Sequence, residues 1–141
     1  MSLHLRLGFL TVCLACCFLV SPLRLAQGQS LSPATTVGAV PSISAKDLKT
    51  LIAEKKPIFI LDVRQKEEYD AGHIDNAVLI PLNVLLDRYN ELPKDKTIVV
   101  YCGSGGRAAR AVTLLGAKGF TNAVRLSGGF IAWEELQKTG K

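Results

Sequence analysis

The sequence predicts an α/β protein whose mostly parallel sheet is covered by helices on both faces. The first observation is that segments 58–63 and 97–101 are short runs dominated by apolar, β-forming residues. A strand exposed on one face would alternate apolar and polar residues, so these runs indicate strands buried on both faces. The second observation is that segments with helical spacing of apolar residues separate the strands, as in sheets whose strands are joined by crossover helices.

The individual elements alternate along the chain. Ser44 is placed to cap a helix from Ala45 to about Glu54, and Pro57 ends that helix. Gly72 and Gly119 stand where two further helices should stop. The expected strands are 58–63, 77–80, 97–101 and 123–126, and the expected helices are 45–54, 65–71, 82–92, 107–118 and 129–138.

Composition excludes several classes of protein. Of the 141 residues, 48% are hydrophobic and 21% are charged, which excludes a disordered, collagen-like or coiled-coil chain. The net charge of +5 comes from scattered basic residues, so nucleic acid is not expected as a partner. The sequence has no cluster with metal-ligand spacing and no phosphate-binding loop with a lysine.

The first 28 residues predict a secretory signal peptide. Arg6 precedes an apolar stretch from Leu7 to Val20, and Ala26-Gln27-Gly28 has the small-residue spacing of a cleavage site. A transmembrane helix needs about 20 residues, so this stretch is short for one. An uncleaved membrane anchor, and after it a lipoprotein site at Cys16 or Cys17, are the alternatives to cleavage. We therefore expect a periplasmic or otherwise extracytoplasmic, secreted protein with a signal peptide at 1–28, a flexible linker at 29–40 and one domain at 41–141.

Cys102 is the only cysteine that would remain after cleavage. The other three, Cys13, Cys16 and Cys17, lie within the predicted signal peptide. Cys102 could then form no internal disulfide, and an exported lone thiol is at risk of oxidation, so its retention indicates use. The alternative is a buried, inert cysteine that packs as a small hydrophobic residue.

The residues around Cys102 favour a reactive role. Cys102 follows the expected strand 97–101, and ligands of open parallel sheets bind at the carboxyl ends of strands. The run Cys102-Gly103-Ser104-Gly105-Gly106-Arg107 contains three glycines, which let backbone N–H groups curl into a nest for an anion. The helix that begins near Arg107 adds its positive end. These features stabilise a thiolate nucleophile and the outer sulfur of a persulfide.

The chain resembles the rhodanese (sulfurtransferase) family from about residue 41 to residue 140. Four motifs carry the resemblance, and they occur in order along the chain. They are Asp62-Val63-Arg64 at a strand end, Glu68-Tyr69 with Gly72-His73-Ile74 and Ala77, the loop from Cys102 to Arg107, and Leu126-Ser127-Gly128-Gly129 with Trp133. Any one of these matches alone would be weak, whereas four spaced matches are specific.

The resemblance implies a rhodanese-like three-layer fold with a mostly parallel sheet of about five strands. It implies that Cys102 takes a sulfane sulfur from thiosulfate, a persulfide or a polysulfide and passes it to cyanide or a thiol. The substrate would be bound by the rest of the loop, namely Gly103, Ser104, Gly105, Gly106 and Arg107. We expect no cofactor beyond the cysteine persulfide, no metal, a monomer, and membrane contact only if the signal is uncleaved. A sulfur-relay protein partner is left open.

Two rival functions compete with sulfur transfer. Related phosphatases share the fold but place five residues between Cys and Arg, whereas four intervene here, and the smaller ring of N–H groups suits a single sulfur better than a tetrahedral oxyanion. The other rival is a persulfide carrier or rhodanese-like interaction domain with little free turnover, which the sequence does not separate from an enzyme. Gly103 stands where many single-domain members have arginine, which predicts poor use of thiosulfate and leaves Arg107 and Arg110 to attract it.

The other polar candidates are interpreted as structural. Asp62 and Arg64 at a strand end, with Glu67 and Glu68 one turn on, suggest an ion-pair or capping network. We interpret His73 as a hydrogen-bonded structural histidine rather than a base, because the loop already activates the thiol. Trp133 is expected to anchor the core or its rim.

Overall fold

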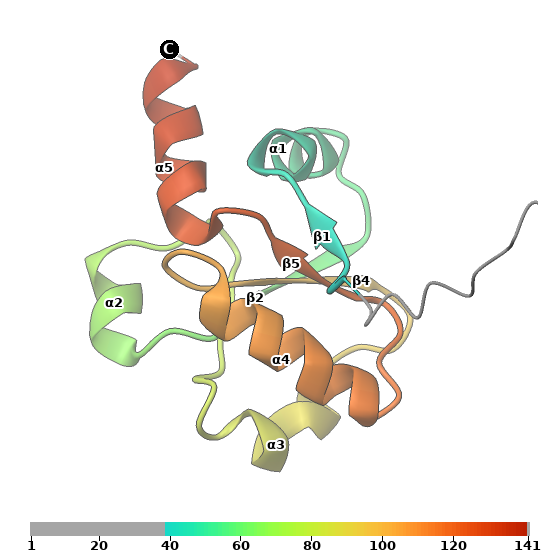
Figure 1. The fold of residues 1–141 in the computed structure, drawn as a ribbon. Helices are drawn as coiled ribbons and strands as arrows, with labels where there is room; N and C mark the ends of the chain where they lie inside the picture. Colours follow the sequence, from blue (N-terminus) through green and yellow to red (C-terminus); the bar gives the residue numbers. More distant parts are fainter. Residues whose placement is uncertain (1–38, 141) are drawn as a thin grey trace, which may run out of the picture. The chain divides into compact units, whose positions relative to one another are not determined.

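The computed structural model describes residues 39–140 of the chain. The predicted signal peptide (1–28) and all but the last two residues of the predicted linker (29–40) lie outside the described residues. The described part contains a five-stranded parallel sheet with the strand order β1-β5-β4-β2-β3 (Figure 1). The strands are β1 (Ser42–Ile43), β2 (Ile58–Asp62), β3 (Val78–Leu79), β4 (Thr97–Tyr101) and β5 (Ala123–Leu126).

Helices cover both faces of this sheet and complete a three-layer α/β fold. α1 (Ala45–Ala53) and α5 (Gly129–Thr139) lie on one face, and α3 (Leu85–Arg88) and α4 (Gly106–Ala117) lie on the other (Figure 1). The short 3-10 helix η1 (Tyr89–Glu91) continues α3, and α2 (Lys66–Ala71) follows β2 at the carboxyl end of the sheet. Within residues 39–140, no helix combines the length and the apolar character needed to cross a bilayer.

The central strand β4 explains the apolar runs seen in the sequence. Ile98 and Val100 point into one apolar cluster, which also holds Cys102 and residues of α3 and α4. Val99 and Tyr101 point into the other cluster, beside α1 and α5. All four side chains are fully buried, so alternate residues need not be polar. The prediction of strands buried on both faces is confirmed.

The structure differs from the sequence prediction in two elements. β1 was not predicted, because a two-residue strand leaves no apolar run to recognise; it pairs with the end of β5. The expected helix 82–92 is shorter, with α3 beginning at Leu85 and a 3-10 turn following it. The remaining elements agree within one or two residues at each end, and the Ser44 hydroxyl accepts the Asp47 N–H at 3.1 Å as the expected cap.

Candidate active site

Cys102 lies directly after β4, at the carboxyl end of the sheet and at its centre. Its side chain is 1% exposed. Its Sγ atom accepts the backbone N–H of Gly105 at 3.1 Å. This hydrogen bond turns the loop back toward the sulfur. Gly105 supplies the one backbone N–H among the described residues that donates to Cys102 Sγ, whereas the sequence predicts a nest of several.

Gly105 is the loop residue whose backbone needs glycine. Its φ of +105° lies in the left-handed region, which residues with a Cβ rarely adopt. Gly105 is also the N-cap of α4, so the same residue starts the helix and aims its N–H at the sulfur. Gly103 and Gly106 have no positive φ, and a Cβ at either position would meet no close contact. The sequence does not distinguish the three glycines, whereas the structure does.

The beginning of α5 holds the backbone of the loop by two hydrogen bonds. The N–H groups of Phe130 and Ile131 donate to the carbonyl oxygens of Cys102 and Gly103, at 2.7 and 3.1 Å. Gly129 makes this approach possible, because a Cβ there would clash with both carbonyl oxygens. This contact gives a physical reason for the glycine pair in the motif 126–129. The role of α5 in holding the loop was not predicted.

Arg107 is held by Glu68, which lies on α2. The guanidinium donates to both carboxylate oxygens at 2.6 Å, and both side chains are 38% exposed. The hydrogen bonds from Arg107 lower the pKa of Glu68 to about 2. The hydrogen bonds to Glu68, and more weakly the Cys102 sulfur, raise the pKa of Arg107. Arg107 therefore lies beside the loop, with its Nη2 atom 3.7 Å from the position of a Cβ on Gly103, and the Glu68 carboxylate offsets its charge.

Asp62 and Arg64 form a second, fully buried ion pair. The Arg64 guanidinium donates to both oxygens of Asp62 at 2.7–3.0 Å and to the Gly72 carbonyl at 2.7 Å. It also lies over the Phe130 ring, 4.3 Å from the ring centroid. The predicted ion pair between these two residues is confirmed. Glu68 takes the capping part of the predicted network, because its carboxylate accepts the Gln65 N–H at the start of α2 at 3.1 Å. Its ion pair is with Arg107 rather than with Arg64.

The remaining candidates take structural positions. His73 is exposed and stacks on the Tyr69 ring with centroids 3.8 Å apart, and its Nδ1 lies 3.0 Å from the Tyr69 carbonyl oxygen. Trp133 is 9% exposed and belongs to the α1/α5 cluster. The structure thus agrees with the structural interpretation of both. Among residues 39–140, no group of three or more His, Cys, Asp or Glu side chains could hold a metal ion.

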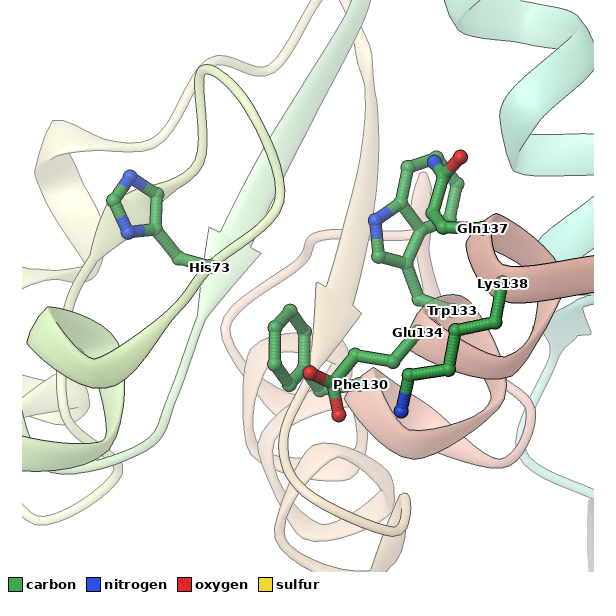
Figure 2. A pocket seen from close by; sticks show the side chains of 6 residues that line it. All are labelled: His73, Phe130, Trp133, Glu134, Gln137 and Lys138. Atoms are coloured by element: carbon green, nitrogen blue, oxygen red, sulfur yellow. The ribbon is translucent and has the colours of Figure 1, made fainter. Parts of the chain in front are cut away.

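Two large cavities open near the loop. One of about 520 Å³ lies along α5 and is lined by the residues labelled in Figure 2, which are His73, Phe130, Trp133, Glu134, Gln137 and Lys138. Another of about 500 Å³ lies along α4 and includes Arg107 and Arg110. Cys102 belongs to the apolar cluster on the α3/α4 side. The cavity along α4 is therefore the one on the side of the sheet where the sulfur lies.

Comparisons with known proteins agree with this geometry. The family model described as the rhodanese-like domain matches residues 44–136. A sulfurtransferase of Allochromatium vinosum is 33% identical over 94 residues, covering 67% of this chain and 88% of the relative. The probable adenylyltransferase/sulfurtransferase MoeZ of Mycobacterium tuberculosis is 36% identical over 94 residues, or 65% of this chain, and the match spans only 24% of MoeZ.

Solved structures show the same fold. A rhodanese-like domain protein from Staphylococcus aureus is 38% identical, with a TM-score of 0.63 over 67% of this chain and 91% of that chain. The predicted fold is therefore confirmed. The chain belongs to the rhodanese-like domain family, which includes proteins named as sulfurtransferases.

Proposed function

We propose that the protein is an exported sulfurtransferase with Cys102 as its nucleophile. The observation that carries this proposal is the hydrogen bond from the Gly105 N–H to the buried Cys102 Sγ at the carboxyl end of the sheet. A backbone N–H aimed at sulfur stabilises the thiolate and then the persulfide that replaces it. Membership of a family with named sulfurtransferases supports the same chemistry.

The reaction proceeds as two displacements on sulfur. The Cys102 thiolate attacks the sulfane sulfur of the donor, a new S–S bond forms, and the donor's S–S bond breaks. With thiosulfate, sulfite leaves with the bond's electron pair. Cyanide or a thiolate then attacks the outer sulfur of the persulfide, and thiocyanate or a new persulfide forms while the Cys102 thiolate returns. The two steps need no external oxidant or reductant.

The experiment for this proposal is intact mass spectrometry after exposure to thiosulfate or polysulfide. The protein should gain about 32 Da, which corresponds to one sulfur held as a covalent intermediate. Cys102→Ser should stay folded and gain nothing, because serine keeps the size but lacks the polarizable sulfur. Loading of the serine variant would overturn the assignment of the nucleophile.

A matched pair of glycine variants tests the part played by the loop. Gly105→Ala forces a Cβ into a left-handed conformation and should slow loading, because the N–H that serves the sulfur moves. Gly116→Ala, on α4 and outside the loop, is the control, since its φ is not positive and a Cβ there meets nothing within 4 Å. Equal loading rates in both variants would contradict the proposed role of the Gly105 N–H.

A persulfide carrier with slow free turnover is the second candidate function. The Glu68–Arg107 pair favours it, because the paired carboxylate offsets the cation that would draw an anionic donor to the sulfur. A carrier would gain the single sulfur but release it slowly to cyanide. An enzyme would both gain the sulfur and release it rapidly to cyanide in the same assay. The rate of release from the loaded protein therefore separates the two functions.

Export is proposed from the apolar stretch 7–20 and the Ala26-Gln27-Gly28 site. Cell fractionation with N-terminal sequencing should find the mature chain outside the cytoplasm, beginning near Gln29. A full-length protein found in the cytoplasm would exclude export.

A further inference from the structure

A groove of about 500 Å³ runs beside the candidate site, between α3 and α4. Its walls come from four places in the chain: Gln65 before α2, Leu82 and Asn83 before α3, Leu86 on α3, and Arg107, Arg110 and Leu114 on α4. We call it the α3–α4 groove. The three α4 residues are spaced by three and four positions, so they share one face of that helix.

Arg107 joins the α3–α4 groove to the loop that holds Cys102, because it lines the groove and lies in the first turn of α4, directly after the loop. Cys102 belongs to the same apolar cluster as Leu85 of α3 and Ala111 of α4, and Leu82 packs against that cluster. The Arg107 Nη2 atom lies 3.7 Å from the position that a Cβ on Gly103, the residue after Cys102, would take. A molecule with its reacting sulfur at Cys102 can therefore extend past Arg107 into the groove.

The charges in the groove select one kind of occupant. Arg107 is paired with Glu68, whereas Arg110 is exposed and takes part in no salt bridge among the described residues. Gln65 and Asn83 are uncharged, so no carboxylate lines the groove. Its remaining walls are Leu82, Leu86 and Leu114, and Leu86 is 42% exposed. The groove thus combines an apolar wall with one uncompensated positive charge.

The distance along α4 sets the length of that occupant. A helix rises about 1.5 Å per residue, so Arg110 lies about 4.5 Å farther along the axis than Arg107. A group that reaches Arg110 is therefore separated from the reacting sulfur by a spacer. The cavity along α5 offers a different setting, because Glu134 and Lys138 place both signs of charge on it and Cys102 lies on the other side of the sheet.

We propose that the α3–α4 groove is a subsite for a small thiol or persulfide that carries a carboxylate. The carboxylate lies at Arg110, the aliphatic spacer lies on the leucine wall, and the sulfur reacts at Cys102. Arg110 is then a specificity-determining residue, selecting anionic thiols over neutral ones of similar size. This inference rests on the proposed sulfurtransferase function and adds the class of thiol that the protein serves.

The test measures transfer from protein that has already been loaded with sulfur. Loss of the added mass is followed with two acceptors, 3-mercaptopropionate, which carries a carboxylate, and 2-mercaptoethanol, which is neutral. The quantity compared is the ratio of kcat/KM for the two acceptors, divided by the same ratio in the wild type. This division removes the difference in intrinsic reactivity between the two thiols.

Arg110→Ala should lower the normalised ratio on the order of fivefold at low salt, and Arg110→Glu should lower it further. Arg110→Lys should keep most of the preference, because it keeps the charge. The effect should shrink as ionic strength rises, since the Debye length is about 10 Å at 0.1 M. Lys46→Ala removes an exposed positive charge on α1, at the opposite face of the sheet, and should leave the ratio unchanged.

The failures of the two proposals are distinguishable. If the wild type never gains the added sulfur, the sulfurtransferase function fails. If all variants load normally but the ratio is the same in wild type, Arg110→Ala and Arg110→Glu, the function stands and the subsite is wrong. An equal loss for both acceptors would also overturn a subsite for small carboxylate-bearing thiols.

Discussion

Two arginine–carboxylate pairs lie at the carboxyl end of this sheet. They contain the same charged groups but differ in sequence separation and in burial. The Asp62–Arg64 pair joins neighbours in sequence, and its side chains are 0% and 5% exposed. The Glu68–Arg107 pair joins residues 39 positions apart, and each side chain is 38% exposed. The first pair lies in the protein interior. The second lies next to the loop that holds Cys102 and borders the α3–α4 groove.

The comparison indicates that burial decides what an ion pair does. A buried pair whose partner is removed leaves a charge in a medium of low polarity, so its loss is felt in folding. A half-exposed pair contributes little to folding because water and salt screen it. Its contribution lies in where it holds the guanidinium relative to the sulfur. We therefore expect changes in the first pair to affect stability and changes in the second to affect transfer.

The largest expected effect on stability comes from Asp62→Ala. It leaves the Arg64 guanidinium buried with only the Gly72 carbonyl and the aromatic rings around it, and should lower the free energy of unfolding by about 3–5 kcal/mol. Urea denaturation followed by circular dichroism measures this change. Glu91→Ala removes the carboxylate of an exposed pair with Arg88 and is the control. A loss of less than about 1 kcal/mol for Asp62→Ala would remove the contrast between the two pairs.

The next effect is on transfer. Arg107→Ala should cost less than about 1 kcal/mol of stability, yet slow sulfur transfer about tenfold or more, because the cation beside the sulfur is lost. Arg107→Lys should retain more activity, since it keeps the charge but not the two-pronged hydrogen bonding to Glu68. If Arg107→Ala instead unfolds the protein while transfer by the folded fraction is normal, the assignment of this pair to the site is wrong.

A smaller effect is expected from adding charge at the rim. Gly103 has no positive φ, and a Cβ there would lie 3.7 Å from the Arg107 Nη2 atom, so arginine fits. Gly103→Arg should raise the rate with thiosulfate a few-fold relative to a neutral persulfide donor at low salt. The gain should fade as ionic strength increases. An equal gain for both donors, or one insensitive to salt, would show that position 103 does not select donors through charge.

The smallest effect concerns pH. Hydrogen bonds from Arg107 depress the pKa of Glu68 from 4.5 to about 2, so the carboxylate stabilises the folded state when it is ionised. This contribution is complete above the unfolded value, declines as pH falls below about 4.5, and is gone below about 2. Stability measured over this range should therefore fall less steeply in Glu68→Gln than in the wild type. Identical slopes would mean that the pair does not persist in solution.

Most of the features that the sequence predicts correctly come from local patterns of residues. The order of elements, the position of Cys102 and the start of α4 depend on neighbours in sequence, so they could be predicted. The Glu68–Arg107 pair and the contact of α5 with the Cys102 carbonyl could not, because they join segments that are distant in the chain. The motifs around Glu68 and Gly129 marked both positions without indicating what they would touch. The short strand β1 was not predicted, because it is defined by its pairing with β5, which lies far away in the sequence.

The burial of Cys102 also acts as a size filter. A disulfide between two copies of the chain would require their Cβ atoms to come within about 4 Å of each other, and a side chain that is 1% exposed does not allow this approach. A small donor needs to bring only one sulfur atom to the Sγ. Cys102, the one cysteine among residues 39–140, is thus protected from forming a disulfide with a second copy of the chain, and we expect only compact sulfur compounds to react with it.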